Sequence, residues 1–474
     1  MYEQFIEGTK NMAIEALRWF VNRFSFYAIA KYNGLGNLKA AMNRLDVSQF
    51  WTIEKIRDYQ KERLKSLLIH AYDTTVYYRK IFDEYRFDPR KLQDIEDINV
   101  LPLLSKEDIR THVDSMISNK FDFRSIHMSE TGGTSGVKMR FYRNNQCLGE
   151  KEAGLYRFEK WAGWKPGERM GIVWPAQQDY VGYWTWKSQL KNELFNRQVV
   201  LPAAVLDDNE IKNYIRQLIS SEPAIIRAFT SPLYEIALYM MRNGICVAPL
   251  NGIITTGEPL YAKQREAIET AFRCKVFDSY RCREAGPIAQ ECQYHDGLHI
   301  NAENLIVEVL PWEDIHSCVN DIGEIVVTDL LNYGMPLIRY RMGDLARLNE
   351  EKCRCGRNLP RIHDIQGRAA DTFYSPNGNR IASGSLVLYL VDEAPGPLGQ
   401  VQIIQDRIDH LTICMTKDPY PSDDLLNYER KTIQRLFGDE MKVSFRFVEN
   451  IPRESSGKYQ FTKCTIKPCN DDSN

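Results

Sequence analysis

The chain has 474 residues, of which 43% are apolar and 26% are charged, and its formal net charge is −2. This length is too great for one hydrophobic core, so we expect a soluble globular protein of about two to four domains. The nearly balanced charge excludes a general nucleic-acid binder, which needs a basic excess.

The first residues do not resemble a secretory signal. Acidic side chains stand at Glu3 and Glu7, where a cationic segment would be needed, and no run of about 18 apolar residues occurs. The 11 cysteines are unevenly spaced, unlike a secreted disulfide framework. We therefore expect a cytoplasmic protein without a transmembrane segment.

Residues 1–90 are predicted to be helical, and a hairpin follows over residues 125–142. Ile53–Ile69 is amphipathic, with opposite charges three or four residues apart. The hairpin tip is a run of small residues: Thr131, Gly132, Gly133, Thr134, Ser135 and Gly136. Such a loop can wrap closely around a phosphate chain, although an ordinary flexible loop has the same composition. A phosphate-loop kinase is disfavoured, because Val137 follows Gly136 where Lys-Ser/Thr would be needed.

Strand-like and helical runs then alternate, which is typical of a parallel sheet with helical crossovers. The predicted strands are 169–174, 224–229, 252–257 and 275–280, and the predicted helices are 209–220, 232–243 and 262–272. A β-rich portion follows, with strands predicted at 305–310, 323–328 and 337–341. Shorter elements resume after Gly367. The sequence therefore predicts an α/β fold, with a large domain over 1–367 and a small, mobile α+β domain over 368–474.

Four further polar clusters follow the hairpin loop along the chain. Thr255–Leu260 and Asp278–Glu284 lie at the ends of neighbouring predicted strands. Because ligands collect outside the carboxyl ends of parallel strands, we expect both beside the loop. Met335–Asp344 and Ile451–Lys458 come later in the chain.

In this order the five clusters resemble the acyl-adenylate-forming superfamily, and specifically its phenylacetate–CoA ligase branch with relatives from capsular polysaccharide biosynthesis. The resemblance runs from about residue 95 to 465. It implies that ATP activates a carboxylic acid as an acyl-adenylate with release of pyrophosphate, and that the acyl group then passes to coenzyme A. It is compatible with a homodimer and does not identify the acid.

The resemblance also implies roles for the matching positions. The small-residue loop would hold the β- and γ-phosphates of ATP. The other positions would contact the nucleotide, the metal ion and the reacting groups: Thr256, Gly257 and Glu258 beside the adenine, Tyr280 stacked on the base, Glu284 on Mg²⁺, Asp344 on the ribose hydroxyls, Arg368 on ribose and phosphate, and Lys458 between the carboxylate and the α-phosphate. Both reactants are anions, so Lys458 and Mg²⁺ would lower their mutual repulsion, and no catalytic base is needed.

Three departures from the family pattern keep alternatives open. Arg281 stands where glycine is common and is expected to crowd the pocket. Ala370 replaces the usual hinge acid, and Val137-Lys138 replaces Lys-Pro, which leaves Lys138 as either an auxiliary phosphate contact or a solvated strand lysine. A scaffold without turnover is one alternative. Another is an adenylate-forming enzyme that transfers the acyl group to a carrier-protein thiol or to an amine in polysaccharide or secondary metabolism.

Two residue sets remain outside these motifs. Tyr183, Trp184 and Trp186 are candidates for an acyl pocket by composition only, and core packing is the favoured interpretation. Three thiols and an imidazole in two short pairs suit a closed structural zinc site: Cys292, His299, Cys353 and Cys355. His295 is an alternative to His299, and four unrelated reduced side chains are the alternative to zinc.

Overall fold

The computed structural model describes residues 26–466 except for short gaps. These gaps are 29, 33, 123, 132–138, 176–184, 187, 189–191, 193–196, 204–205, 312–321, 350, 367–371, 378–379, 383–385, 388–389, 392–393, 396–398, 418–419 and 453–458. Within the described part of the chain, no helix is both long and apolar enough to cross a membrane.

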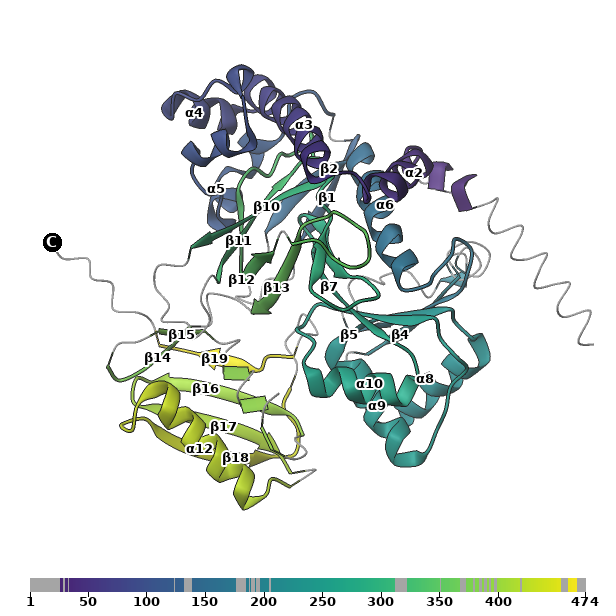
Figure 1. The fold of residues 1–474 in the computed structure, drawn as a ribbon, viewed down its shortest axis with the longest axis vertical. Coiled ribbons are helices and arrows are strands. Elements are labelled where there is room, and N and C mark those ends of the chain that lie inside the picture. The colour runs from purple at the N-terminus through teal and green to yellow at the C-terminus, as the bar shows by residue number, and fades with distance from the viewer. Residues whose placement is uncertain are drawn as a thin grey trace, which may run out of the picture.

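One mixed sheet of 11 strands forms the centre of the large domain (Figure 1). Its strands, in spatial order, are β10 (Leu305–Pro311), β11 (Gly323–Asp329), β12 (Tyr340–Asn349), β13 (Arg361–Gln366), β9 (Leu298–Ile300), β8 (Gly286–Glu291), β7 (Val276–Cys282), β6 (Gly252–Thr256), β5 (Ile225–Phe229), β3 (Met170–Trp174) and β4 (Gln198–Pro202). From β4 to β7 the neighbours are parallel, and from β7 to β10 they are antiparallel. The predicted parallel sheet and the predicted β-rich portion are therefore one continuous sheet.

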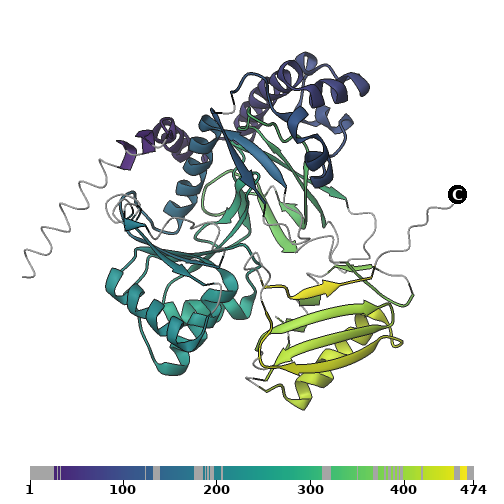
Figure 2. The same cartoon turned by 180° about the vertical axis from the view of Figure 1, so that it is seen from behind.

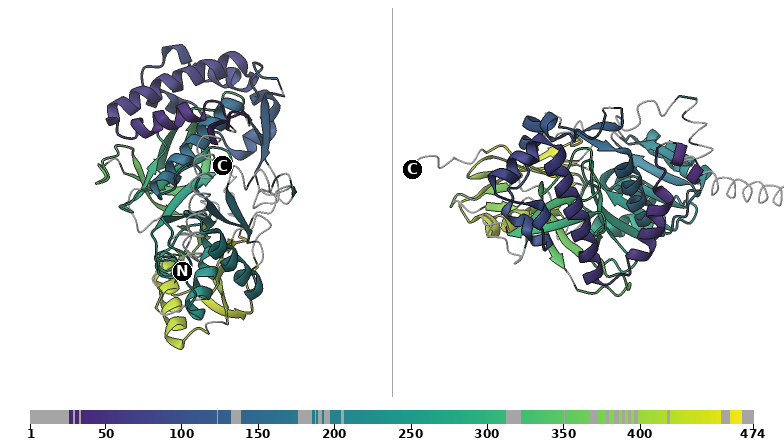
Figure 3. Two further views of the ribbon diagram at one scale, coloured as in Figure 1. Left: turned by 90° about the vertical axis from the view of Figure 1, so that its right-hand side faces the viewer. Right: turned by 90° about the horizontal axis from the view of Figure 1, so that it is seen from above.

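Helices cover both ends of this sheet. The parallel part packs on three helices through a core of aliphatic side chains: α8 (Asp208–Ser221), α9 (Thr230–Asn243) and α10 (Ala262–Phe272). The antiparallel part packs on the N-terminal helices, which lie at the far end of the molecule from the C-terminal domain (Figure 3). These are α3 (Ile53–Thr74), α4 (Val76–Glu84), η1 (Pro89–Lys91), η2 (Ile95–Val100) and α5 (Lys106–Met116).

Helix α6 (Asn145–Trp161) follows the separate hairpin of β1 (Ile126–Glu130) and β2 (Arg140–Asn144) and contacts both α2 (Leu38–Ser48) and β8. A buried ion pair fixes α6, since Arg157 Nη1 lies 2.7 Å from Glu303 Oε1. Arg157 also donates to Asn301 Oδ1 at 2.6 Å. A shift of α6 would separate this pair and leave two buried charges uncompensated, which costs free energy. The pair therefore holds α6 in a defined position against the sheet.

The C-terminal domain has its own four-stranded sheet and core. Its strand order is β18 (Lys442–Val448), β17 (His410–Thr416), β16 (Val401–Arg407) and β19 (Thr462–Cys464), and the short pair β14 (Thr372–Tyr374) and β15 (Arg380–Ala382) lies beside it. Helix α12 (Asp423–Phe437) covers one face, and the view from behind shows the strands on the other (Figure 2). Together the two sheets give the predicted α/β architecture with a small α+β domain.

The predicted elements agree with the structure where hydrophobic periodicity is strong, and one predicted strand was misplaced. Residues 337–341 were expected to be a strand, but β12 begins at Tyr340. Arg339 has a φ of 52°, which ends the extended backbone. Its guanidinium donates to the Leu101 carbonyl at 2.7 Å and pairs with Glu308 at 2.9 Å, so tertiary contacts stabilise this break.

A buried carboxyl group in α12 gives the first testable prediction. Glu429 is fully buried, and neither carboxylate oxygen has a hydrogen-bond partner among the described residues. Burial raises its pKa to about 9, against a smaller opposing effect of Lys263. The pKa of Glu429 is therefore higher in the folded than in the unfolded state. Its contribution to the free energy of unfolding is fully present below about pH 4.5 and is lost as the pH rises toward 9. We expect Glu429→Gln to raise the melting temperature by several degrees at pH 8 and hardly at all at pH 5, by calorimetry.

The exposed Glu440 of the same domain supplies the control. Glu440→Gln should leave the melting temperature unchanged at both pH values. Equal effects of the two substitutions would contradict the assignment of a buried, protonated Glu429.

Candidate nucleotide site and candidate metal centre

The predicted hairpin is present, and its base is closed by two hydrogen bonds. The Thr131 N–H donates to the Met139 carbonyl at 2.9 Å, and the Met139 N–H donates to Thr131 Oγ1 at 3.2 Å. The loop residues Gly132, Gly133, Thr134, Ser135 and Gly136, with Lys138, lie outside the described residues. The structure therefore fixes where the loop begins and ends.

Two arginines connect the hairpin base with the turn after β7. Arg283 Nη1 donates to the Glu130 carbonyl at 3.1 Å, immediately before Thr131. Arg143 of β2 donates through Nη1 to the Arg283 carbonyl at 3.5 Å and through Nη2 to Ser129 Oγ of β1 at 2.6 Å. Neither arginine was predicted, although Arg283 directly precedes the acid of the matched motif. The contacts bring the phosphate-loop candidate beside Glu284.

Glu284 is buried at this turn and held by residues that the sequence analysis did not select. Tyr340 Oη donates to Glu284 Oε1 at 3.0 Å, and Lys151 Nζ donates to the Glu284 carbonyl at 2.7 Å. Lys151 also forms a buried ion pair of 2.7 Å with Asp329. The carboxylate of Glu284 is thus oriented by its neighbours and supplies the hard oxygen ligand that Mg²⁺ prefers.

Tyr280 and Asp344 are adjacent in the structure despite their distance along the chain. Tyr280 Oη donates to Asp344 Oδ2 at 2.6 Å. Burial, and then the negative charge of Asp344, raise the pKa of the Tyr280 phenol well above its usual value. The tyrosine therefore remains a neutral hydrogen-bond donor, and it holds the carboxylate that the resemblance assigns to a ribose.

The carboxyl end of β6 lies beside the carboxyl end of β7, which carries Tyr280. Thr256 is aligned with Ser279 of β7. Gly257 has a φ of 83°, and a Cβ there would lie 2.6 Å from the Phe229 ring, so only glycine fits. Both oxygens of the Glu258 carboxylate are engaged, accepting from the Ser231 N–H at 2.8 Å and from the Tyr459 N–H at 2.7 Å.

The hydrogen bond from Tyr459 to Glu258 brings the C-terminal domain to the carboxyl ends of β6 and β7. Tyr459 directly follows Lys458, and its hydroxyl donates to the Val401 carbonyl at 2.7 Å. Phe461 packs against Tyr261, with ring centroids 5.5 Å apart. Lys458, Arg368 and Ala370 themselves lie outside the described residues.

The described parts of the first four clusters therefore lie together at the carboxyl ends of β6 and β7, and Tyr459, which directly follows the fifth cluster, contacts Glu258 there. A cavity of about 370 Å³ lies elsewhere, at the end of the β1–β2 hairpin away from the loop, and contains none of the predicted site residues. Among the residues that line it are Arg63, His70, Lys120, Asn144, Gln146 and Glu150.

Trp186 is 70% exposed, so the expected core packing of this side chain is wrong. Tyr183 and Trp184 lie outside the described residues.

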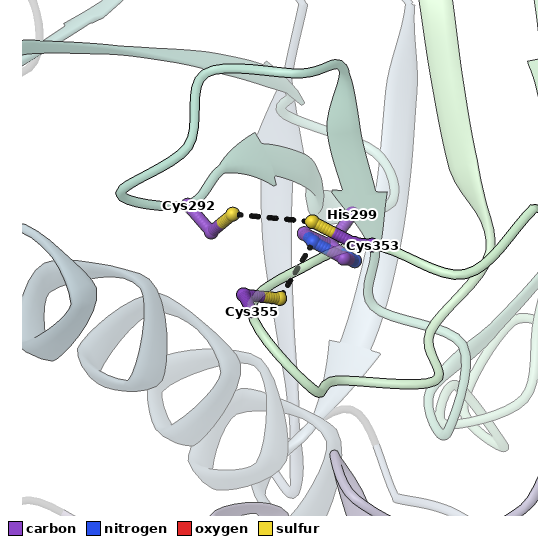
Figure 4. Close-up of side chains that lie close together, drawn as sticks. All are labelled: Cys292, His299, Cys353 and Cys355. Carbon is purple, nitrogen blue, oxygen red and sulfur yellow. Dashed lines mark hydrogen bonds between the residues drawn. The ribbon is translucent and has the colours of Figure 1, made fainter.

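The three cysteines and the histidine of the predicted metal site come together (Figure 4). Their ligand atoms all lie within 4.8 Å of one another. Cys292 Sγ is 3.8 Å from Cys353 Sγ, and Cys355 Sγ is 3.4 Å from His299 Nε2. A tetrahedral zinc with bonds of about 2.3 Å to sulfur requires sulfur atoms about 3.8 Å apart, so the donor set fits this ion.

The surroundings of the cluster favour metal binding by His299. Its Nδ1 lies 3.1 Å from the Leu359 carbonyl, which accepts a hydrogen bond from the protonated ring nitrogen. The other ring nitrogen, Nε2, faces Cys355 and is available to a metal ion. The Arg357 N–H donates to Cys355 Sγ at 3.4 Å, which favours the thiolate that zinc requires. His295 instead contacts Glu291 at 3.0 Å, so the alternative ligand is wrong. Because β8 runs antiparallel to β7, Cys292 lies at the opposite sheet edge from Glu284, which suits a structural site.

The chain is similar in sequence to several known proteins. The family model of the CapK C-terminal domain matches residues 373–465. Protein CapK of Staphylococcus aureus is 26% identical over 419 residues, which is 86% of this chain and 89% of the relative. Phenylacetate-coenzyme A ligase of Thermus thermophilus is 26% identical over 326 residues, 67% of this chain and 71% of the relative.

Solved structures show the same fold at lower sequence identity. A crystal structure of 2-hydroxyisobutyryl-CoA ligase in the postadenylation state, in complex with 2-HIB-AMP, has a TM-score of 0.69 at 20% identity, covering 87% of this chain and 90% of that chain. The same ligase with 2-HIB-AMP and CoA in the thioesterification state has a TM-score of 0.57 at 20% identity, covering 88% and 91%.

Proposed function

We propose that this chain, which belongs to the adenylate-forming ligase superfamily, activates a carboxylic acid with ATP and then transfers the acyl group to coenzyme A. The observation on which the proposal rests is the hydrogen bond from Tyr459 to Glu258. It places the residue next to Lys458 at the strand end that the resemblance assigns to the nucleotide. Four of the matched clusters meet there through described contacts.

The residues can be assigned to steps of the first half-reaction. A carboxylate oxygen attacks the α-phosphorus, and the bond to the pyrophosphate oxygen breaks. The loop after Thr131 and the guanidinium of Arg283 would bind the leaving phosphates. Mg²⁺, when held by Glu284, would offset the phosphate charge. Asp344, oriented by Tyr280, would fix the ribose, so that the reacting atoms are aligned before reaction.

The domain arrangement supports the first half-reaction rather than the second. The higher TM-score with the postadenylation structure than with the thioesterification structure favours an adenylation-type placement of the small domain. Lys263 Nζ contacts the Val391 carbonyl at 3.3 Å and the Ala394 carbonyl, and these contacts hold the domains together here. Movement of the small domain would remove Lys458 and admit the acyl acceptor.

The acceptor separates the proposal from its nearest alternative. Transfer to a carrier-protein thiol or to an amine would use the same first half-reaction, so the product formed with each acceptor has to be identified. The purified chain should be incubated with ATP, Mg²⁺ and a panel of carboxylic acids, and pyrophosphate exchange into ATP measured. Products formed with coenzyme A, a carrier protein or an amino sugar are then identified by mass. No exchange with any acid would contradict adenylate formation.

A further inference from the structure

The cavity of about 370 Å³ at the end of the β1–β2 hairpin has no part in the proposed function. Its wall comes from four separate parts of the chain: α3, the loop after α5, the junction of β2 with α6, and the loop between β11 and β12. Helix α3 and the start of α6 lie in the half of the molecule away from the C-terminal domain (Figure 1). The volume is in the range of about 300–1,000 Å³ that is usual for small-molecule sites.

Asn144 is the group in this wall that most directly indicates a ligand. It stands at the N-cap of α6, where an asparagine side chain normally accepts from a backbone N–H of the first turn, but it makes no such hydrogen bond. The residue is only 5% exposed, and its Oδ1 has no hydrogen-bond partner in the described part of the chain. A buried acceptor without a donor is unfavourable, and a ligand hydroxyl in the cavity would provide that donor.

The first turns of α6 contribute to the same cavity. Gln146 and Glu150 line it together with Asn144. The helix is 17 residues long and has no acidic residue in its first turn, so its N-terminus keeps the partial positive charge of the helix dipole. Backbone N–H groups at such a helix end bind phosphate and other anions. The position of the cavity at this end therefore favours an anionic ligand.

Two basic side chains add positive charge to the cavity. Arg63 of α3 and Lys120 of the loop after α5 both line it. Of the described lining residues, only Glu150 is acidic, and it is already paired with Arg44 and lies 3.9 Å from Arg63 Nη2. No described carboxylate forms an ion pair with Lys120. The cavity therefore has more positive charge than the protein itself compensates.

The rest of the wall is apolar and aromatic. The rings of Phe121 and Tyr333 both pack edge-to-face on His70, with centroids 6.2 and 5.0 Å from it. The His70 Nε2–H donates to the Tyr333 carbonyl at 2.8 Å, which fixes the imidazole. Burial lowers the pKa of His70, so its ring is neutral at neutral pH. Leu330 and Leu331 complete this wall, which suits the carbon-bound hydrogens of a ligand.

We propose that this cavity is a second ligand site, which binds a small phosphate ester that carries hydroxyl groups, such as a sugar phosphate. A phosphate monoester has nearly two negative charges at neutral pH, which match Arg63 and Lys120 better than a single carboxylate does. Its oxygens would also accept from the first turn of α6. A hydroxyl would donate to Asn144 Oδ1, and the carbon skeleton would pack on the aromatic wall. The inference goes beyond the proposed function and does not depend on it.

The test measures binding to the full chain by isothermal titration calorimetry. The probes are glucose 6-phosphate and ribose 5-phosphate, each compared with its neutral sugar and with inorganic phosphate. We expect the Kd of each sugar phosphate to be at least 10-fold lower than that of either part alone. Saturating MgATP should leave this Kd unchanged, because the cavity contains none of the residues assigned to the nucleotide.

Three variants connect the binding with the cavity. Lys120→Gln, at an exposed position, should raise the Kd about 10-fold, because one charge-assisted hydrogen bond is lost. Asn144→Asp should also raise it about 10-fold, because it brings an anion beside the phosphate. Aspartate is a preferred N-cap residue, so this variant should melt near the wild-type temperature. Lys80→Gln, exposed on α4 and outside the cavity, should bind as the wild type does.

The wild-type titrations decide the inference without depending on the folding of a variant. No binding of either sugar phosphate would overturn it and would mean that solvent fills the cavity. Binding of inorganic phosphate as tight as that of the sugar phosphates would also overturn it, since the hydroxyls would then have no role. Displacement by MgATP, or unchanged binding by a folded Lys120→Gln, would place the ligand elsewhere. Absence of acid-dependent pyrophosphate exchange would contradict the proposed function and leave this inference intact.

Discussion

Replacing Lys458 by alanine is expected to lower acid-dependent pyrophosphate exchange by about 10²- to 10³-fold, the usual effect of losing one preorganised charge donor. The physical reason is that attack of a carboxylate on an α-phosphate brings two anions together. An ammonium group between them offsets the repulsion as the new bond forms. Exchange is measured at saturating acid and ATP, so that a change in binding does not obscure the rate.

A second lysine in the same domain provides the matched control. Lys463 is exposed on β19, five residues further along the chain. Lys463→Ala should exchange at the wild-type rate. Thioester formation from a chemically prepared acyl-adenylate should survive in Lys458→Ala, because the proposed role of this lysine ends with the first half-reaction. Wild-type exchange by Lys458→Ala would contradict the assigned role of the C-terminal segment.

Loss of the metal centre is expected to have the largest effect on stability. Cys353→Ser should remove stoichiometric zinc and lower the melting temperature by on the order of 10 °C, since loss of a structural zinc removes several kcal/mol of folding free energy. The site links the end of β8 and strand β9 to the loop between β12 and β13. Zinc is measured by elemental analysis of tag-free protein, and melting by calorimetry.

Cys274 is a suitable control because it lies outside the cluster. Cys274→Ser should retain zinc and melt near the wild-type temperature. Because the cluster lies at the opposite sheet edge from Glu284, Cys353→Ser should still catalyse exchange at low temperature. Tag-free wild-type protein without zinc, together with unchanged melting of Cys353→Ser, would mean that the four side chains are simply reduced neighbours.

The elements that the sequence predicted most accurately are those defined by short-range patterns. The predicted helix at 262–272 agrees with α10, and the predicted strands at 224–229 and 252–257 agree with β5 and β6 to within one residue. Their apolar periodicity is complete within a single element, so no distant contact is needed to specify it. The strand predicted at 337–341 was misplaced because Arg339 bends the chain through contacts with distant residues.

The matched motifs predicted which residue types occur at the candidate site but not how they are held. Tyr280 and Asp344 were each predicted as nucleotide contacts, and only the fold shows the hydrogen bond between them. Lys151 and Tyr340 orient Glu284, yet neither stands in a recognisable motif. Cysteine and histidine spacing indicated a metal centre, whereas the choice of His299 over His295 depended on which ring faces Cys355.

The sequence by itself determined the fold class, the order of the motifs and the residues of the candidate metal centre, because these depend on spacing and periodicity along the chain. The tertiary structure decided three things. The two predicted sheet regions are one sheet, Glu258 accepts a hydrogen bond from Tyr459 next to Lys458, and Arg281 donates to the neutral side chains of Ser279 and Gln290. Each joins groups that are brought near only by the path of the folded chain, so no local pattern could specify it.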